Sequence, residues 1–383
     1  MRAPKVLIVH PFMPAYRVAL VSELGARVEI LGGKLLFAES TPPPAIALRQ
    51  DSRTTAFGVQ VPTKWMAAGG HDIAYRSVRS LLPTFQPELI VVQQEIRNLE
   101  TYPLFLQARK VKAEIGMWGH GRSYSTPQSA PLAEAKQWLT RRTKWFFAYT
   151  QAGADHVVTG GFPRVRTTVL NNTIDTDSLR RDLDSVTADE VASFRERTES
   201  AAGKTALFIG GVDEAKGIGF LLDSLPHVAS LLPGFTLLIA GDGAQRSLVQ
   251  AAETAGLPLR YLGRLDGHEK AVALAAADVL AIPEWIGLVA IDSLVAGLPI
   301  VSTVHPSHSP EHEYLEDGVT CIYSPHEPGE YAKALVELLS DPRRLHAMQE
   351  ACEAESKKYS IDLMADRFIE GLLAWDEMRR FGL

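Results

Sequence analysis

The chain has 383 residues, of which 46% are hydrophobic and 22% are charged, as in ordinary globular proteins. This composition excludes a disordered chain, a collagen-like repeat and a coiled-coil rod, and the length predicts about two domains. The formal net charge is -6, but residues 1–200 carry +6 and residues 201–383 carry -12. A basic first half suits an anionic partner or membrane surface, and scattered solvated side chains explain it equally well. Nothing in the sequence resembles a nucleic-acid-binding module, so we expect no nucleic-acid partner.

Two features of the sequence bear on where the protein works. Cys321 and Cys352 are the only cysteines, which excludes a disulfide scaffold and a cysteine-rich zinc site and leaves two buried thiols as the expectation. The long uncharged stretch 293–310 is interrupted by glycine and proline, so it does not predict a membrane span. No secretory signal pattern follows Met1. We therefore expect a cytoplasmic location, with peripheral contact at the inner face of the membrane as an option.

Short apolar runs with strand character alternate with longer stretches of helical period. The predicted strands are residues 5–9, 27–31, 89–93, 113–118, 145–149 and 167–170, then 206–210, 236–240, 259–262, 279–282, 300–302 and 320–323. This alternation predicts an α/β fold of doubly wound parallel sheets. A charged, weakly apolar segment at 182–204 predicts the linker, which gives a first domain over residues 1–200 and a second over 201–360.

Two glycine turns follow strands of the second half. Residues 208–217 read FIGGVDEAKG, where Gly210 and Gly211 follow a strand and Lys216 precedes a predicted helix at 218–225. Glycines let backbone amides approach a phosphate, and a lysine near a helix start adds a cation. The sequence AGDG at 240–243 is a similar turn. A plain strand-to-helix turn explains each of them equally well.

The segment 283–303 carries the most specific pattern. Glu284 follows a buried strand, Gly287 is predicted to open a helix, and Asp292 lies eight positions after Glu284. The free amides of Gly287, Leu288 and Val289 would form an anion site at the helix start. Two carboxylates beside an anion site suit a sugar nucleotide, with one binding sugar hydroxyls and the other a ribose diol. As an isolated motif, the segment fits an exposed loop acid and a helix-face acid at least as well.

With these motifs, the sequence resembles the family 4 retaining glycosyltransferases of GT-B fold. The family's conserved patterns correspond to residues 171–175, 210–216, 241–243, 284–292 and 296–300. Residues 11–24 and 308–318 also resemble a subgroup that builds bacterial surface polysaccharides. The resemblance implies two Rossmann-like doubly wound domains facing each other across a cleft, with the acceptor bound by the first and the nucleotide sugar by the second. It also implies that the C-terminal helix, residues 361–383, returns to the first domain.

The resemblance implies a role for individual residues of the second half. Glu284 would hold the donor sugar and Asp292 the ribose, while Lys216 and the helix amides would bind the diphosphate. Glu311 would lie beside the donor phosphate and sugar. Gly211 departs from the pattern because the family has a phosphate-binding arginine there, so Arg122 or Arg264 is expected to compensate. Asp292 replaces a glutamate and is one methylene shorter.

The first half supplies the remaining candidates. His120, in MWGHGRS, corresponds to a histidine that in the family faces the donor sugar, and a satisfied structural histidine is the alternative. Tyr16, Arg17 and Arg122 are assigned to the acceptor side. No metal or other cofactor is expected, although the spacing of His305, His308, His312 and Glu311 would also suit zinc.

The expected activity is transfer of a sugar, with retention, from a nucleoside-diphosphate sugar to a glycan or lipid-linked acceptor. UDP is slightly favoured over GDP as the donor nucleotide. A basic, aromatic stretch at 136–150 suits contact with an anionic membrane, and a surface helix that runs into a buried strand explains it equally well. The alternatives are a non-catalytic protein that binds sugar nucleotides and a GT-B epimerase acting on the nucleotide sugar itself.

Overall fold

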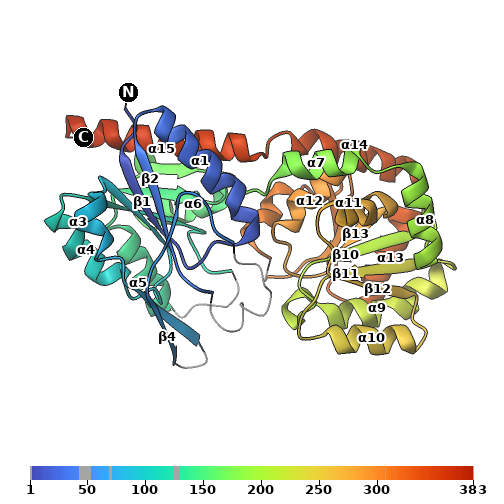
Figure 1. The fold of residues 1–383 in the computed structure, drawn as a ribbon. Coiled ribbons are helices and arrows are strands. Elements are labelled where there is room, and N and C mark those ends of the chain that lie inside the picture. The colour runs from blue at the N-terminus through green and yellow to red at the C-terminus, as the bar shows by residue number, and fades with distance from the viewer. Residues whose placement is uncertain (1, 43–52, 69–70, 125–129, 307, 383) are drawn as a thin grey trace. The chain divides into compact units, whose positions relative to one another are not determined.

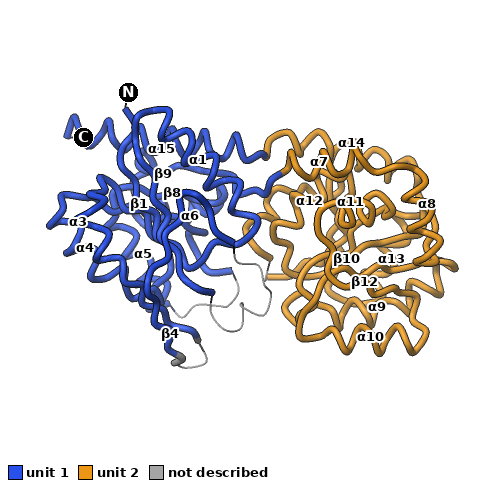
Figure 2. Tube along the Cα trace, in the orientation of Figure 1, with its two compact units in different colours: residues 1–175, 360–383 blue, residues 176–359 orange. Residues whose placement is uncertain are grey.

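The chain folds into two compact units, which are coloured separately in Figure 2. The computed structural model describes residues 2–42, 53–68, 71–124, 130–306 and 308–382. Unit 1 comprises Met1–Asp175 and Ser360–Leu383, and unit 2 comprises Thr176–Tyr359. The boundary expected near residue 200 is therefore too late. Helices α7 (Thr176–Asp184) and α8 (Ala188–Thr198) belong to unit 2 because both pack on α11 (Gly267–Ala276).

Unit 1 is built on a parallel sheet, of which β1 and β2 are labelled in Figure 1. Its described strands follow the order β3-β2-β1-β6-β7-β8-β9. These strands are β1 (Lys5–Val9), β2 (Lys34–Glu39), β3 (Gly58–Gln60), β6 (Leu89–Gln93), β7 (Glu114–Gly119), β8 (Trp145–Ala148) and β9 (Thr167–Val169). An antiparallel hairpin is formed by β4 (Thr63–Ala68) and β5 (His71–Arg76). The described helices are α1 (Val18–Ile30), α3 (Leu81–Phe85), α4 (Thr101–Lys110), α5 (Ala130–Thr140), α6 (Gln151–Thr159) and α15 (Ile361–Phe381).

Helices cover both faces of the unit 1 sheet, because the side chains of β1 are buried on both faces in turn. Val6 and Ile8 belong to a buried cluster with side chains of α1 and α15, whereas Leu7 and Val9 join a second cluster with side chains of α3 to α6. Successive side chains of a strand point to opposite faces, so a strand covered on both sides is a continuous apolar run. This explains why KVLIV was recognisable as a strand from the sequence.

One predicted strand is wrong. Residues 27–31 form the end of α1 and the turn after it, and the strand lies at Lys34–Glu39 instead. The segment RVEIL contains β-branched residues, but Val28 continues the helical period of Leu20, Val21 and Leu24, all of which are buried. Packing of that helical face outweighs local strand propensity.

Unit 2 is built on a parallel sheet with the described strand order β12-β11-β10-β13-β14-β15. Its strands are β10 (Thr205–Ile209), β11 (Thr236–Ala240), β12 (Leu259–Gly263), β13 (Val279–Ala281), β14 (Ile300–Thr303) and β15 (Cys321–Ser324). Its remaining helices are α9 (Ile218–Leu231), α10 (Arg246–Thr254), α12 (Val289–Ala296), α13 (Pro328–Leu339) and α14 (Pro342–Ser356). The predicted α/β class of two doubly wound domains is confirmed.

Both cysteines of unit 2 are buried, as expected. Burial raises the pKa of the Cys321 thiol and of the Cys352 thiol to about 12 in each case, so both stay protonated at neutral pH. Among the described residues, no helix combines the length and the apolar character that a membrane crossing requires.

The C-terminal helix α15 is part of the core of unit 1. The Phe368 ring stacks on Phe147 of β8 at 4.2 Å between centroids and 10° between planes, and it meets the Trp118 ring edge-on. Trp375 is also buried, and its Nε1 donates to the Glu114 carboxylate at 2.8 Å. Residues from the end of the chain therefore complete the apolar layer beside β7 and β8.

We predict that Phe368→Ala destabilises unit 1 by about 3–5 kcal/mol, because it leaves a cavity beneath the sheet. Leu363→Ala on the same helix is the matched control, since Leu363 is 36% exposed. Urea unfolding followed by fluorescence measures the difference between the two variants. Equal stability of the two variants would contradict the assigned packing of α15.

Candidate functional site in unit 2

The unit 2 sheet changes direction between β10 and β13. From β10 the chain proceeds outward through β11 to β12, and it then returns to the other side of β10 to add β13, β14 and β15. In sheets of this kind ligands bind at the carboxyl ends of the strands beside such a switch point. Lys216 follows β10 and Glu284 follows β13, so these two predicted residues flank the switch point.

Glu284 and Lys216 lie in adjoining turns that are packed tightly. Gly217 has φ +69°, and a Cβ added to it would lie 2.9 Å from the Glu284 Cδ, so a side chain at this position would displace the carboxylate. Lys216 Nζ donates to the Trp285 carbonyl oxygen at 2.8 Å. Trp285 itself has φ +47°, an unusual conformation for a bulky residue and one that functional sites often hold.

The start of α12 offers the three amides that the sequence predicted. The helix begins at Val289, two residues later than expected, and no side chain caps it. Within the described part of the chain, the N–H groups of Gly287, Leu288 and Val289 have no acceptor. Free amides at a helix start attract anions, so this turn can bind a phosphate.

His308 fixes the backbone just before these amides. Its Nδ1 accepts from the Ile286 N–H at 3.2 Å, and its Nε2–H donates to the Thr303 carbonyl at 2.9 Å. The bond to Nδ1 requires the neutral ring, because a protonated Nδ1 cannot accept. Burial lowers the His308 pKa to about 4, which keeps the ring neutral at physiological pH.

Asp292 is 9% exposed, and its carboxylate accepts from Lys270 Nζ of α11 at 2.7 Å. The ion pair was not predicted from the sequence. A ribose diol bound by Asp292 would have to share the carboxylate with Lys270 or replace it. The aspartate that replaces the glutamate of the resembling family therefore has an ion-pair partner on the neighbouring helix α11.

The two glycine turns differ in what they allow. A Cβ on Gly241 would lie 1.8 Å from the Gly210 carbonyl oxygen, so the turns after β10 and β11 touch through their backbones. A Cβ on Gly211 would meet only the Asp213 carboxylate, at 2.7 Å. Asp213 Oδ1 also accepts from the Ala244 N–H at 3.0 Å. An acidic side chain therefore lies beside the position where the resembling family has its arginine.

Two further predicted residues of unit 2 have local partners. Arg264 follows β12, two strands from β10, and its Nε lies 2.9 Å from the Asp266 carboxylate. Glu311, in the 3₁₀ turn Pro310–Tyr314, is 2% exposed and accepts from the Ser309 hydroxyl.

Two of the predicted residues of unit 1, Arg17 and His120, lie beside the same Tyr149 ring, and the Arg17 guanidinium is 5.4 Å from its centroid. His120 follows β7, and its ring lies 4.3 Å from that of Tyr149. Arg122 is exposed, and its guanidinium lies 4.5 Å from the Tyr124 ring. Tyr16 is 38% exposed, but Arg17 is only 1% exposed and stacks on the Trp118 ring at 4.8 Å. Arg17 is thus enclosed by the rings of Tyr16, Trp118 and Tyr149.

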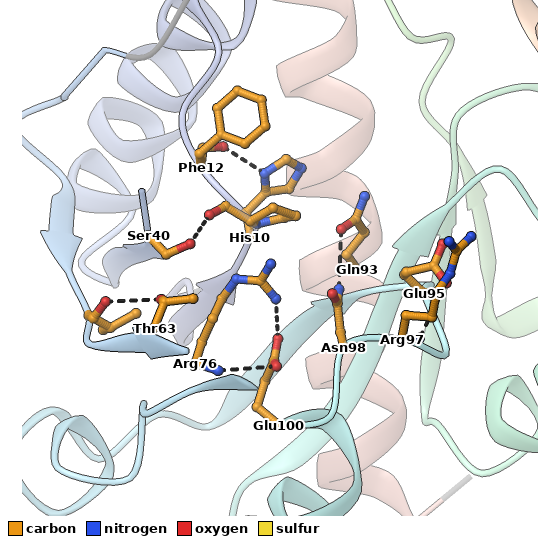
Figure 3. A network of polar contacts seen from close by, with 12 residues as sticks. His10, Phe12, Ser40, Thr63, Arg76, Gln93, Glu95, Arg97, Asn98 and Glu100 are labelled. Carbon is orange, nitrogen blue, oxygen red and sulfur yellow. Dashed lines mark hydrogen bonds and ion pairs between the residues drawn. The ribbon is translucent and has the colours of Figure 1, made fainter. Parts of the chain in front are cut away.

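Unit 1 has its own buried polar network at the carboxyl ends of β1 and β6, shown in Figure 3. His10 follows β1, and its Nδ1–H donates to the Phe12 carbonyl at 2.9 Å. Burial, aided by the charge of Arg17, lowers the His10 pKa to about 3. Nearby, the buried Arg76 donates to the Glu100 carboxylate at 2.5 Å. Sequence reasoning missed this network because the hairpin that carries Arg76 was not predicted.

Two histidines, His305 and His326, lie beside Glu284, and the sequence did not predict this contact. His326 Nε2 lies 2.8 Å from Glu284 Oε1, and the rings of His326 and His305 are 4.9 Å apart. His305 was expected beside His308, His312 and Glu311 as an optional zinc group. In the described residues it groups with Glu284 and His326 instead. The usable signal was that His326, like Glu284, lies within three residues of the end of a strand.

Titration of His308 predicts a loss of stability in acid. Because its folded-state pKa lies below the ordinary value of 6.5, the unfolded chain takes up the proton first as the pH falls. The free energy of unfolding should fall between about pH 6.5 and pH 4, by up to about 3 kcal/mol. His308→Gln retains a donor and an acceptor without the charge, so urea unfolding across this range should show a smaller loss. An unchanged pH dependence in this variant would contradict the assignment.

Comparison with known proteins gives a family match within unit 2, the part of the chain that carries the candidate site. The fold is that of the GT-B glycosyltransferases: the structure of HepE from Anabaena in complex with UDP-glucose aligns with a TM-score of 0.70 at 17% identity, covering 97% of this chain and 100% of that one. Residues 203–341 match the family model described as "Glycosyl transferases group 1". Residues 203–341 are thus similar to the group 1 glycosyltransferases, and the GT-B fold that the resemblance implied is confirmed.

Curated relatives are similar over different lengths. The phosphatidyl-myo-inositol mannosyltransferase of Mycobacterium tuberculosis is 40% identical over 106 residues, which is 26% of this chain and 28% of that protein. The glycogen synthase of the same organism is 26% identical over 314 residues, covering 78% of this chain and 72% of the synthase. The mannosyltransferase match therefore spans little more than a quarter of that protein.

Proposed function

We propose that this protein is a retaining glycosyltransferase that moves a sugar from a nucleoside-diphosphate sugar to a glycan or lipid-linked acceptor. The observation that carries the proposal is the convergence of Glu284, Lys216 and three free amides at the switch point of unit 2. The group 1 family match over residues 203–341 and the two transferase relatives support it.

Each group at the switch point has a distinct task in this proposal. The amides of Gly287, Leu288 and Val289 bind the diphosphate, and Gly210 and Gly211 allow the backbone to approach it. Lys216 exchanges the Trp285 carbonyl for a phosphate oxygen and neutralises the charge of the leaving diphosphate. Such groups, fixed before the reaction, stabilise the transition state without reorganising during it.

The carboxylates serve binding rather than acid catalysis. Glu284 accepts from hydroxyl groups of the donor sugar, while Asp292 binds the ribose and Glu311 supports the loop beside the phosphates. The acceptor attacks the anomeric carbon on the side of the leaving group, and the leaving diphosphate oxygen takes the acceptor proton. His120 faces the donor sugar, while Tyr16, Arg122 and the buried Arg17 stay assigned to the acceptor side.

We expect a UDP sugar rather than a GDP sugar and synthesis of a bacterial polysaccharide. Trp138 of α5 is 46% exposed with the Arg142 guanidinium 3.5 Å from its ring, which suits peripheral contact with an anionic membrane. Lys136 of the same helix is buried, so it adds no charge to that surface. The non-catalytic and epimerase alternatives are not favoured by the transferase relatives.

We predict that Glu284→Gln lowers kcat by roughly 10- to 100-fold, because a charged hydrogen bond to the sugar is worth about 1.5–3 kcal/mol. The affinity for the nucleoside diphosphate alone should change less than about threefold. Glu337→Gln, an exposed residue of α13, is the matched control and should leave both quantities unchanged. Isothermal titration with UDP and GDP, together with donor-turnover assays, separates the two effects. Equal loss of diphosphate affinity and turnover would reject the sugar-binding role.

We also predict that transfer continues in excess EDTA. In this proposal the diphosphate charge is neutralised by Lys216 and the α12 amides, so no divalent ion is required for turnover. The rate measured after extensive chelation should stay within about twofold of the untreated rate. Loss of activity that manganese or magnesium restores would show that this assignment of the diphosphate site is wrong.

A further inference from the structure

Glu284 has a second set of neighbours that the proposed transfer reaction does not use. His305 follows β14 and His326 follows β15, so the three side chains come from the carboxyl ends of three adjacent strands. One ligand atom from each residue lies within 4.8 Å of the other two. Glu284 is 16% exposed and His326 is 37% exposed at the side chain, which leaves the group open to solvent on one side.

We propose that Glu284, His305 and His326 form a binding site for a divalent transition-metal ion of the zinc type. Two imidazoles and one carboxylate are a ligand set that zinc prefers, and a fourth position is left for water. Bonds of about 2.0–2.1 Å to zinc place ligand atoms roughly 3.4 Å apart on a tetrahedron. The ligand atoms lie within 4.8 Å of one another, so metal binding would draw them closer together.

The surroundings of the two histidines favour an ordered site. The Phe220 ring of α9 stacks on His326 at 4.4 Å between centroids and 25° between planes, which limits rotation of that imidazole. Glu284 packs against Gly217, which limits the movement of its carboxylate. His308 does not compete, because both its nitrogens are engaged by backbone groups.

Metal binding would take Glu284 away from its proposed donor. A carboxylate that coordinates zinc cannot also accept freely from a sugar hydroxyl, so the ion should inhibit transfer. This consequence rests on the proposed function, whereas the metal site itself does not. Inhibition by zinc is also consistent with transfer that continues in EDTA, because chelation would only remove the inhibitor.

The test is direct zinc binding to the full chain, measured by competition with a chromogenic chelator. The wild-type chain should bind one equivalent of zinc, and magnesium should not compete for it. His305→Asn and His326→Asn should each weaken binding at least about tenfold, and the affinity should fall as the pH is lowered, because metal-binding imidazoles must be neutral. Thermal unfolding checks that both variants remain folded.

His346→Asn is the matched control. His346 is 72% exposed on α14 and lies 3.5 Å from Glu350, so it offers a histidine–carboxylate pair without a third ligand. This change should leave zinc affinity unchanged. Absence of a stoichiometric wild-type site, or equal losses in His326→Asn and His346→Asn, would overturn the proposed metal site whatever the transfer assay gives. If zinc binds as expected but does not slow transfer, the competition with the donor is rejected and the metal site stands.

Discussion

The packing of Glu284 over Gly217 is the constraint on which the candidate site depends. It requires a residue without a side chain at the end of the turn after β10, and it places that turn against the one after β13. The Lys216 bond to the Trp285 carbonyl closes the same contact from the other direction. A carboxylate, an ammonium group and a free helix start are thereby gathered from segments about 70 positions apart in the sequence. A parallel sheet brings such segments together because its strand ends share one edge.

Buried neutral histidines support strand ends in both units. His308 holds the turn before α12 by accepting from one backbone group and donating to another, and His10 donates to the backbone just after β1. In each case burial depresses the pKa of the imidazole, so the fold relies on the uncharged ring. Protonation would convert the acceptor nitrogen of His308 into a donor facing the Ile286 N–H. The geometry of the turn before α12 is therefore tied to a group that titrates only in acid.

The sequence predicted the parts of this structure that local pattern determines. Buried parallel strands such as Lys5–Val9 and Thr236–Ala240 are largely continuous apolar runs. Glu284 and Lys216 stand in turns whose residue spacing is typical of the resembling family. Pairings between distant segments could not be predicted in the same way. Lys270 meets Asp292, and His326 meets Glu284, only because α11 and the turn after β15 are folded beside α12 and β13. The burial of Arg17 likewise depends on rings from β7 and from the turn after β8.

The central claim is that the amides of Gly287, Leu288 and Val289 bind the diphosphate of the donor. Hydrogen exchange measured by mass spectrometry with and without UDP or GDP tests it most directly, because bound phosphate protects the amides that it accepts from. The account predicts slower exchange in a peptide covering residues 286–290, together with protection around Lys216. Nucleotide binding that leaves this peptide unchanged while protecting residues elsewhere, such as the pocket lined by α8 and α11, would contradict it.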